Sequence, residues 1–279
     1  MTFRLAHLSD IHFGGELPDA VEGALGAVAE FAPTVTVVTG DLTLNGLPRE
    51  FRSARAWLDR LPHPIVVTPG NHDTPYWNLP LRSLAPFNRY RRYVGEPGAA
   101  SFNAPGLAVR AVNSARGAQP RLNWAKGALT ISHLQQIDWG ADAETTKVFA
   151  CHHPLIDLQG APVTGGVHRG DRAARVLADA GVNLILTGHV HVPFAIALPG
   201  RGRQTCYAIG AGTLSVRTRG APPSFSTIVR SENEFVVTVL AWADGRFKPL
   251  NVWRLPRFST DSSQGNAQPV PSSDEPPTN

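Results

Sequence analysis

Aspartate, asparagine and histidine residues follow several apolar runs of the chain, and side chains of these types are common metal ligands. Asp41 comes directly after the β-branched run 36–39 and Gly40. Other residues in such positions are Asp10, His12, Asn71, His152, His189 and His191. Because neighbouring parallel strands end at the same edge of a sheet, we expect these side chains to converge although they are far apart in the sequence.

The types and number of these residues indicate the metals and the reaction. Imidazole, carboxylate and amide ligands together suit Mn, Fe or Zn, whereas Ca takes oxygen ligands and structural Zn sites are rich in thiolates. The set is too large for one ion. Two ions about 3.5–4 Å apart, bridged by a carboxylate, are the arrangement that hydrolyses phosphate esters.

A simpler explanation exists for each residue alone. Asp41 or Asn71 would individually be an ordinary turn residue. For the set this explanation fails, because it gives no reason for Gly-Asn-His-Asp (70–73) and Gly-His-Val-His (188–191) to end separate strands. Of the adjacent pair His152 and His153, only one should bind metal, since successive strand residues point to opposite faces. We assign no role to the isolated histidines His7, His63, His133 and His168.

Strand-like runs alternate with helical patterns in the first two thirds of the chain, which is typical of an α/β fold. Strands are predicted at 3–9, 34–39, 65–68, 107–113, 148–151 and 182–187, and helices at 18–31, from 48, and at 171–180. After Pro193 only short strands follow, and they predict an antiparallel part. Segment 74–106 is expected to be an irregular insertion with one short helix near 87–94.

Composition limits the class of protein. We expect one catalytic domain at 1–256 and a disordered tail rich in Pro and Ser at 257–279. No apolar run reaches the roughly 18 residues of a membrane helix, and no secretory leader precedes the first strand, so we expect a cytoplasmic protein without a membrane span. Cys151 lies in an apolar run, which favours a buried free thiol.

The formal net charge of +4 would help to steer an anionic small-molecule substrate. The basic residues are scattered apart from the run Arg89 to Tyr93, for which a solvated helix face is favoured over a phosphate-facing rim. We therefore expect no stable nucleic-acid partner, and the sequence leaves the oligomeric state open.

Five blocks in order, Asp10-Ile11-His12, Gly40-Asp41, Gly70-Asn71-His72-Asp73, His152 and Gly188-His189-Val190-His191, make the chain similar to the calcineurin-like metallophosphoesterases. Within that family the chain most resembles the bacterial class III cyclic nucleotide phosphodiesterases. The resemblance implies a four-layer αββα sandwich with a dinuclear metal site at the strand ends. The cofactors would be two divalent or mixed-valence ions of Mn, Fe or Zn.

The resemblance also implies roles for individual residues. Asp10, His12 and His191 would bind one ion, Asn71, His152 and His189 the other, and Asp41 would bridge them. His72 would be the catalytic histidine and Asp73 would orient its imidazole. A hydroxide bridging the two ions would attack phosphorus in line.

The expected function is therefore a metal-dependent phosphodiesterase, with a 3′,5′-cyclic nucleotide as the favoured phosphoester. Asn45 and Arg49 are candidates for contacting a phosphate or nucleoside, although solvent-exposed loop residues are an equally good interpretation. One alternative is a nucleotide-sugar lipid pyrophosphohydrolase of the same fold, whose apolar groove Tyr76, Trp77, Phe87 and Tyr93 would line. A non-catalytic protein-binding scaffold is less favoured, because every expected ligand and His72 are present.

Overall fold

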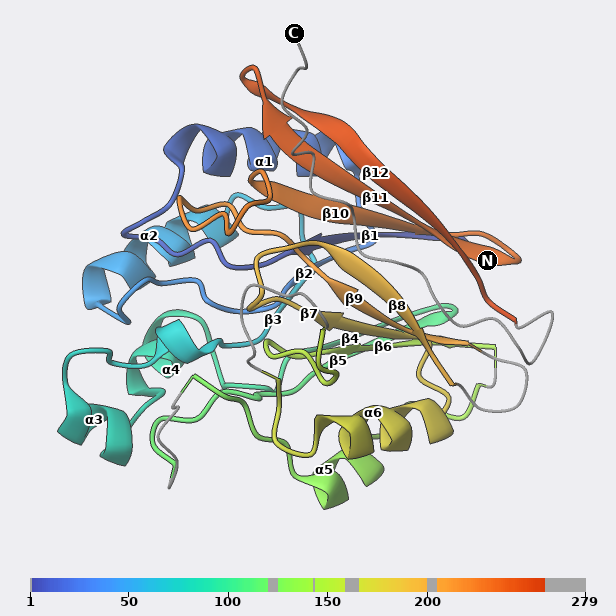
Figure 1. Ribbon diagram of the computed structural model, residues 1–279, viewed down its shortest axis with the longest axis horizontal. Helices are drawn as coiled ribbons and strands as arrows, with labels where there is room; N and C mark the ends of the chain where they lie inside the picture. Colours follow the sequence, from blue (N-terminus) through green and yellow to red (C-terminus); the bar gives the residue numbers. More distant parts are fainter. Residues whose placement is uncertain (1, 120–124, 143, 159–165, 200–204, 259–279) are drawn as a thin grey trace, which may run out of the picture.

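The computed structural model describes residues 2–119, 125–142, 144–158, 166–199 and 205–258. Two β-sheets pack face to face, and helices cover their outer faces (Figure 1). This arrangement is the four-layer αββα sandwich expected from the sequence. The last strand ends at Pro256, and the part of the expected tail from residue 259 onward lies outside the described residues.

The first sheet has six strands in the order β12-β11-β10-β1-β2-β3. Its parallel half consists of β1 (Phe3–Leu8), β2 (Val35–Val38) and β3 (Ile65–Val67). Its antiparallel half consists of β10 (Ser224–Arg230), β11 (Glu234–Ala243) and β12 (Arg246–Pro256). Because β10 pairs antiparallel with β1, the C-terminal strands extend the sheet beside the first strand of the chain.

The second sheet has six strands in the order β4-β5-β6-β7-β9-β8. Its four central strands are parallel: β5 (Leu107–Ala111), β6 (Thr146–Ala150), β7 (Leu184–Thr187) and β9 (Cys206–Gly210). The edge strands β4 (Ser101–Ala104) and β8 (Phe194–Leu198) pair antiparallel with them. The predicted antiparallel character after Pro193 is therefore correct for the strands except β9, which pairs parallel with β7.

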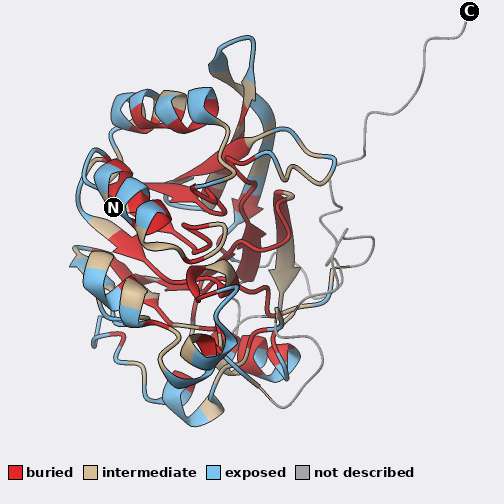
Figure 2. Cartoon of the chain, turned by 90° about the vertical axis from the view of Figure 1, so that its left-hand side faces the viewer, coloured by how far each residue is buried: buried red, intermediate tan, exposed pale blue. Residues whose placement is uncertain are grey.

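Alternation along the strands builds the core on both faces of each sheet. Val35 and Val37 of β2 face the space between the sheets, whereas Val38 packs with the helices outside. Helices α1 (Pro18–Phe31) and α2 (Pro48–Leu58) cover the first sheet. Helices α5 (Ile131–Gln135) and α6 (Gly170–Asp179) cover the second. Figure 2 shows the buried residues on the strands and on the inward sides of the helices.

The insertion between β3 and β5 contains more regular structure than expected. The 3-10 turn η1 (Asn71–Asp73) precedes segment 74–106, which holds α3 (Leu79–Leu84), β4 and α4 (Asn88–Tyr93), the one short helix that was expected. The prediction did not include α3, whose first turn contains Pro80, a position where proline is well tolerated. Here the Asn78 side chain also caps the helix by accepting a hydrogen bond from the Leu81 N–H at 2.9 Å.

Two further expectations concern thiols and membranes. Cys151 and Cys206 are both buried and free, as expected for Cys151. Among the described residues, every helix is too short or too polar to cross a bilayer.

Candidate metal centre

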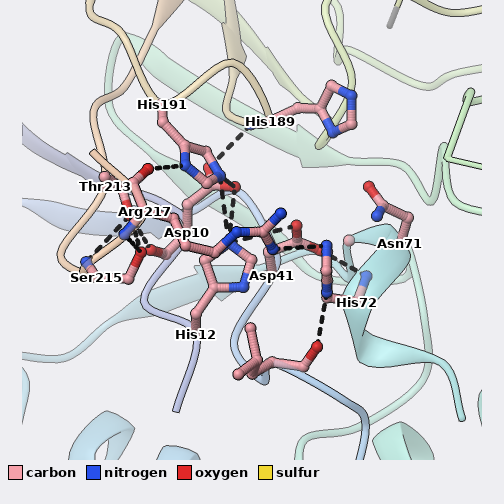
Figure 3. Close-up of polar contacts among 12 residues, drawn as sticks. Asp10, His12, Asp41, Asn71, His72, His189, His191, Thr213, Ser215 and Arg217 are labelled. Atoms are coloured by element: carbon pink, nitrogen blue, oxygen red, sulfur yellow. Dashed lines mark hydrogen bonds and ion pairs between the residues drawn. The ribbon is translucent and has the colours of Figure 1, made fainter. Parts of the chain in front are cut away.

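The loops after β1, β2, β3, β6 and β7 carry the predicted ligands. Figure 3 shows six of these residues side by side: Asp10, His12, Asp41, Asn71, His189 and His191. The ligand atoms of Asp10, His12 and His191 all lie within 4.8 Å of one another. Those of Asp10, Asp41 and His152 do so as well. Because the two groups share Asp10, and the second contains Asp41, the carboxylates lie at the centre of one continuous cluster.

The backbone at these loops adopts an uncommon conformation. Positive φ angles occur at Asp10 (56°), His12 (52°), Asp41 (50°), His189 (70°) and His191 (61°), which are all predicted ligands. A non-glycine residue in the left-handed region costs free energy and persists only where its surroundings enforce it. The surrounding structure therefore holds the backbone of these five residues in this conformation.

Glycine allows the loops to approach closely. A Cβ atom added at Gly70 would collide with the carboxylate and the backbone nitrogen of Asp41. One added at Gly188 would collide with Ser9 and with the carboxylate of Asp10. The glycines of the Gly-Asn-His-Asp and Gly-His-Val-His blocks therefore let the backbone pass directly against the two central carboxylates.

One half of the cluster is built around Asp10. Its Oδ1 lies 3.0 Å from Nε2 of His191 and 3.7 Å from Nε2 of His12. Its Oδ2 accepts a hydrogen bond from the backbone N–H of His189 at 2.9 Å. This bond fixes the carboxylate while leaving Oδ1 directed at the two imidazoles.

Asp41 lies between the two halves. Its Oδ2 is 3.8 Å from Nε2 of His12 and 3.3 Å from Nε2 of His152. Its Oδ1 accepts the backbone N–H of His72 at 2.8 Å. A single carboxylate oxygen therefore faces ligands of both predicted metal sites, which is the position expected of a bridge.

Backbone carbonyl groups hold three of the imidazoles. Nδ1 of His12 faces Thr43 O at 3.4 Å, and Nδ1 of His152 faces Thr39 O at 2.7 Å. Nδ1 of His191 faces the carbonyl oxygen of Arg217 at 2.5 Å. Because a carbonyl oxygen only accepts, each Nδ1 carries a proton, and each Nε2 is the ring nitrogen that faces the cluster.

Four buried ligand atoms have no hydrogen-bond partner among the described residues. They are Asp10 Oδ1, Asn71 Oδ1, His152 Nε2 and His189 Nε2. Buried polar atoms are almost always satisfied in folded proteins, so acceptors that converge without donors indicate a place for a cation. The residues present therefore fit metal ions of the kind that prefers imidazole, carboxylate and amide ligands.

Burial and charge also suit metal binding. Burial lowers the pKa of His12 and of His189 to about 3, so both rings are neutral at pH 7 and their lone pairs are available. Burial alone would raise the pKa of Asp41, but His152 and His72 hold it well below its usual value. Burial would lower the pKa of His152, whereas the attraction of Asp41 and Asp10 raises it to about 9.

His153 lies beside the cluster with both ring nitrogens occupied. Its Nδ1 accepts from the Ser114 hydroxyl at 2.8 Å, and its Nε2 donates to Ala125 O at 2.8 Å. Its ring centroid lies 4.7 Å from that of His189. His153 is thus hydrogen-bonded and packed against a predicted ligand, and the expectation that only one histidine of the pair binds metal stays a prediction.

His72 occupies the open side of the cluster, where its ring centroid lies 4.9 Å from that of His12. Its Nδ1 donates to Leu44 O at 2.7 Å.

The expectation that Asp73 orients this imidazole needs correction. The Asp73 carboxylate accepts from the backbone N–H groups of Leu42, Thr43 and Gly70 and from the Thr43 hydroxyl, at 2.9 to 3.2 Å. Asp73 therefore ties the β2 loop to the β3 loop, and the Leu44 carbonyl orients the ring.

Comparison with known families identifies the chain. The family model described as "Calcineurin-like phosphoesterase" matches residues 3–193, which include every residue of the cluster. The chain belongs to the calcineurin-like phosphoesterases. It is accordingly a phosphoester hydrolase, as the sequence predicted.

Two curated relatives and one solved structure resemble this phosphoesterase over most of its length. A protein of Synechococcus sp. named "Probable cyclic nucleotide phosphodiesterase" is 27% identical over 74% of this chain and 78% of its own. A Rhodococcus erythropolis protein of the same name is 28% identical over 73% of this chain and 71% of its own. The fold matches a dimetal phosphatase from Danio rerio with a TM-score of 0.63 and 13% identity, covering 91% of this chain and 99% of that one.

The two candidate substrate contacts lie at the start of α2. The Asn45 side chain donates to Glu50 Oε1 at 3.4 Å, and its backbone N–H donates to Glu50 Oε2 at 2.8 Å. Arg49 is exposed in the first turn of α2. Asn45 helps to hold the start of α2, so a substrate contact by either residue stays a prediction.

Two arginines near the cluster were missed by the sequence analysis. Arg217 and Arg219 lie in the loop between β9 and β10. Nη1 of Arg217 donates to Nε2 of His72 at 3.0 Å, and Nη1 of Arg219 donates to the carbonyl oxygen of His189 at 2.8 Å. Both arginines lie more than 25 residues after Gly188-His189-Val190-His191, the last of the five blocks. The one sequence signal that could have indicated them is that they are two positions apart in a segment that contains glycine.

The aromatic residues of the insertion do not line one groove. Phe87 is buried, and Tyr93 stacks on Phe51 with a centroid distance of 5.9 Å and an interplanar angle of 4°. Both belong to the core under α2. Tyr76 and Trp77 alone among the four candidates are exposed, which removes half of the apolar lining expected for a lipid-type substrate.

Proposed function

We propose that this phosphoesterase is a dinuclear metal-dependent phosphodiesterase that hydrolyses a 3′,5′-cyclic nucleotide. The observation that carries the proposal is the position of Asp41 Oδ2, which lies 3.8 Å from His12 Nε2 and 3.3 Å from His152 Nε2. A carboxylate that faces two sets of ligands is suited to bridging two cations. The substrate class is supported by the two relatives named probable cyclic nucleotide phosphodiesterases.

Each of the two sites would have its own set of ligands. Asp10, His12 and His191 would hold one ion, and Asn71, His152 and His189 the other, with Asp41 shared between them. Two divalent ions of Mn, Fe or Zn, when bound, would supply Lewis acidity toward a water molecule and the phosphoryl oxygens.

The residues around these ligands would bind and orient the phosphoester. His72 turns Nε2 toward Arg217 while the Leu44 carbonyl holds Nδ1. Nε2 accepts from Arg217 in this arrangement, so it would donate to a leaving oxygen only after it takes up a proton and releases the guanidinium group. Arg217 would bind a phosphoryl oxygen through its guanidinium group, since arginine matches the geometry of phosphate.

A substrate panel on the purified, Mn-loaded protein tests the proposal. We expect turnover of cyclic AMP and of bis(p-nitrophenyl) phosphate, with two equivalents of metal per chain by elemental analysis. Turnover of bis(p-nitrophenyl) phosphate without turnover of any cyclic nucleotide would contradict the substrate assignment. A single bound equivalent in a fully active enzyme would contradict the dinuclear assignment. A UDP-linked lipid in the same panel tests the pyrophosphohydrolase alternative.

A further inference from the structure

Two exposed aromatic residues adjoin the candidate catalytic histidine. Tyr76 is 44% exposed and Trp77 is 76% exposed. The Tyr76 ring lies parallel to the His72 imidazole, with a centroid distance of 6.0 Å and an interplanar angle of 9°. Trp77 meets Tyr76 edge to face at 5.0 Å and 74°. The three rings thus form a continuous row that leads from the metal centre to solvent.

The inner part of this row is held firmly. The Tyr76 N–H donates to Asn45 O at 3.1 Å. Two residues before Tyr76, the carbonyl of Thr74 packs so closely on Gly46 that a Cβ atom at Gly46 would collide with it. The buried Arg82 lies over the Tyr76 ring, with its guanidinium carbon 6.0 Å from the ring centroid. Tyr76 is therefore a fixed spacer between His72 and Trp77.

Single exposed aromatic residues are common on protein surfaces and need no functional explanation. This pair differs because its first ring lies on the imidazole of the candidate site and its second ring leaves most of its surface open. The edge of the same imidazole contacts a cation, since Arg217 Nη1 lies 3.0 Å from His72 Nε2. A cation and a flat apolar surface that both adjoin the candidate catalytic group match a ligand that carries both a phosphoryl group and a planar ring.

We propose that Trp77, positioned by Tyr76, forms an aromatic subsite that stacks the base of a nucleoside phosphate whose phosphoryl group lies at the candidate metal centre. This inference rests on the proposed function and adds to it the residues that select the substrate. Stacking of a base on an aromatic side chain tolerates different bases, because every base has a π-face. The subsite would therefore favour nucleotides over phosphodiesters with aliphatic substituents, and it would discriminate weakly between adenine and guanine.

The test uses the full-length, Mn-loaded protein and three variants. Trp77→Ala removes the outer ring, Trp77→Phe restores a ring, and Leu84→Ala removes an apolar side chain that is 86% exposed on the neighbouring helix α3. Titration calorimetry with AMP and with ribose 5-phosphate compares a phosphate that carries a base with one that does not. Elemental analysis and thermal melting confirm that each variant keeps its metals and its fold.

We expect Trp77→Ala to reduce the preference for AMP over ribose 5-phosphate about tenfold. Trp77→Phe should recover most of this preference, and Leu84→Ala should match the wild type. Equal weakening of both ligands by Trp77→Ala would overturn the subsite, because a structural defect would act on both. An unchanged preference would overturn it as well.

Turnover separates this inference from the proposed function. Cyclic AMP and glycerophosphoethanolamine are diesters with and without a base, and we expect Trp77→Ala to lower the ratio of their kcat/KM values about tenfold through KM. If the wild type hydrolyses both diesters while its AMP preference is independent of Trp77, the subsite fails and the phosphodiesterase assignment stands. If it hydrolyses neither while the AMP preference depends on Trp77, the proposed function fails and the base-binding subsite stands.

Discussion

Nη1 of Arg217 donates a hydrogen bond to Nε2 of His72 at 3.0 Å, across 145 residues of sequence. The carbonyl oxygen of the same arginine accepts from Nδ1 of His191 at 2.5 Å. One residue of the β9–β10 loop therefore holds a predicted metal ligand through its backbone and contacts the candidate catalytic imidazole through its side chain. Substitution at this position separates the two interactions, because every amino acid keeps the carbonyl.

Replacing Arg217 with alanine should lower kcat/KM for phosphodiester hydrolysis by roughly 10- to 100-fold, since a hydrogen bond to a charged group contributes about 1.5–3 kcal/mol. The metal content should not change, because the carbonyl that holds His191 remains. Steady-state kinetics and elemental analysis measure both quantities. Arg52→Ala, which removes an exposed arginine of α2, is the matched control and should behave as the wild type. Loss of metal in Arg217→Ala would show that the side chain supports the site structurally.

Replacing Asp41 with asparagine should reduce both activity and metal content, because its carboxylate faces ligands of both sites. Replacing His72 with alanine should reduce activity less severely and leave both ions bound, since the imidazole lies at the open side of the cluster. Elemental analysis of the two purified variants, with bis(p-nitrophenyl) phosphate kinetics, makes the comparison. Two equivalents of metal in Asp41→Asn would refute the bridging role.

Local patterns predicted the alternation of strands and helices and the clustering of the ligands, whereas the four-layer sandwich was implied by the resemblance to the calcineurin-like metallophosphoesterases. A buried β-branched run such as 35–38 predicts a strand, and a polar residue after Gly40 predicts where its loop places a side chain. Arg217 could not be predicted, because its contact with His72 depends on how a distant loop folds across the edge of the sheets. Asp73 was misassigned for a related reason: its proximity to His72 in sequence says nothing about the backbone N–H groups that the fold brings to its carboxylate.

Replacing Gly70 with alanine should disrupt the site although it removes no ligand. The new Cβ atom would overlap the Asp41 carboxylate and backbone nitrogen, so the β2 and β3 loops must separate. We expect lower metal content and a melting temperature reduced by several degrees, consistent with about 1–3 kcal/mol of overpacking.

Gly26→Ala provides the matched control for that substitution. Gly26 is exposed in α1, and no atom lies within 4 Å of where its Cβ would be. Alanine stabilises a helix interior by about 1 kcal/mol relative to glycine, so this variant should melt at or above the wild-type temperature. A Gly70→Ala protein with wild-type metal content and melting temperature would contradict the close approach of the two loops.

His7 should make the stability of the protein depend on pH. It is fully buried on β1, its Nε2 lies 3.0 Å from Thr39 Oγ1, and burial lowers its pKa to about 3. In the unfolded chain the His7 imidazole takes up a proton as the pH falls below about 6.5. In the folded chain it does not take up this proton until the pH approaches 3. The free energy of unfolding should therefore fall as the pH is lowered from 6.5 toward 3, by up to about 1.4 kcal/mol per pH unit from this residue alone.

Urea denaturation of the wild type and of His7→Gln at pH 7.5, 6.5 and 5.5 measures this contribution. Glutamine can keep a hydrogen bond with Thr39 but does not titrate, so the stability of the variant should decline less steeply between pH 6.5 and 5.5. The metal ligands are unchanged in both proteins, and their titration should cancel in the difference between the two curves. Parallel curves over this interval would mean that His7 binds its proton equally in the folded and unfolded chains, and would refute the effect of burial on its pKa.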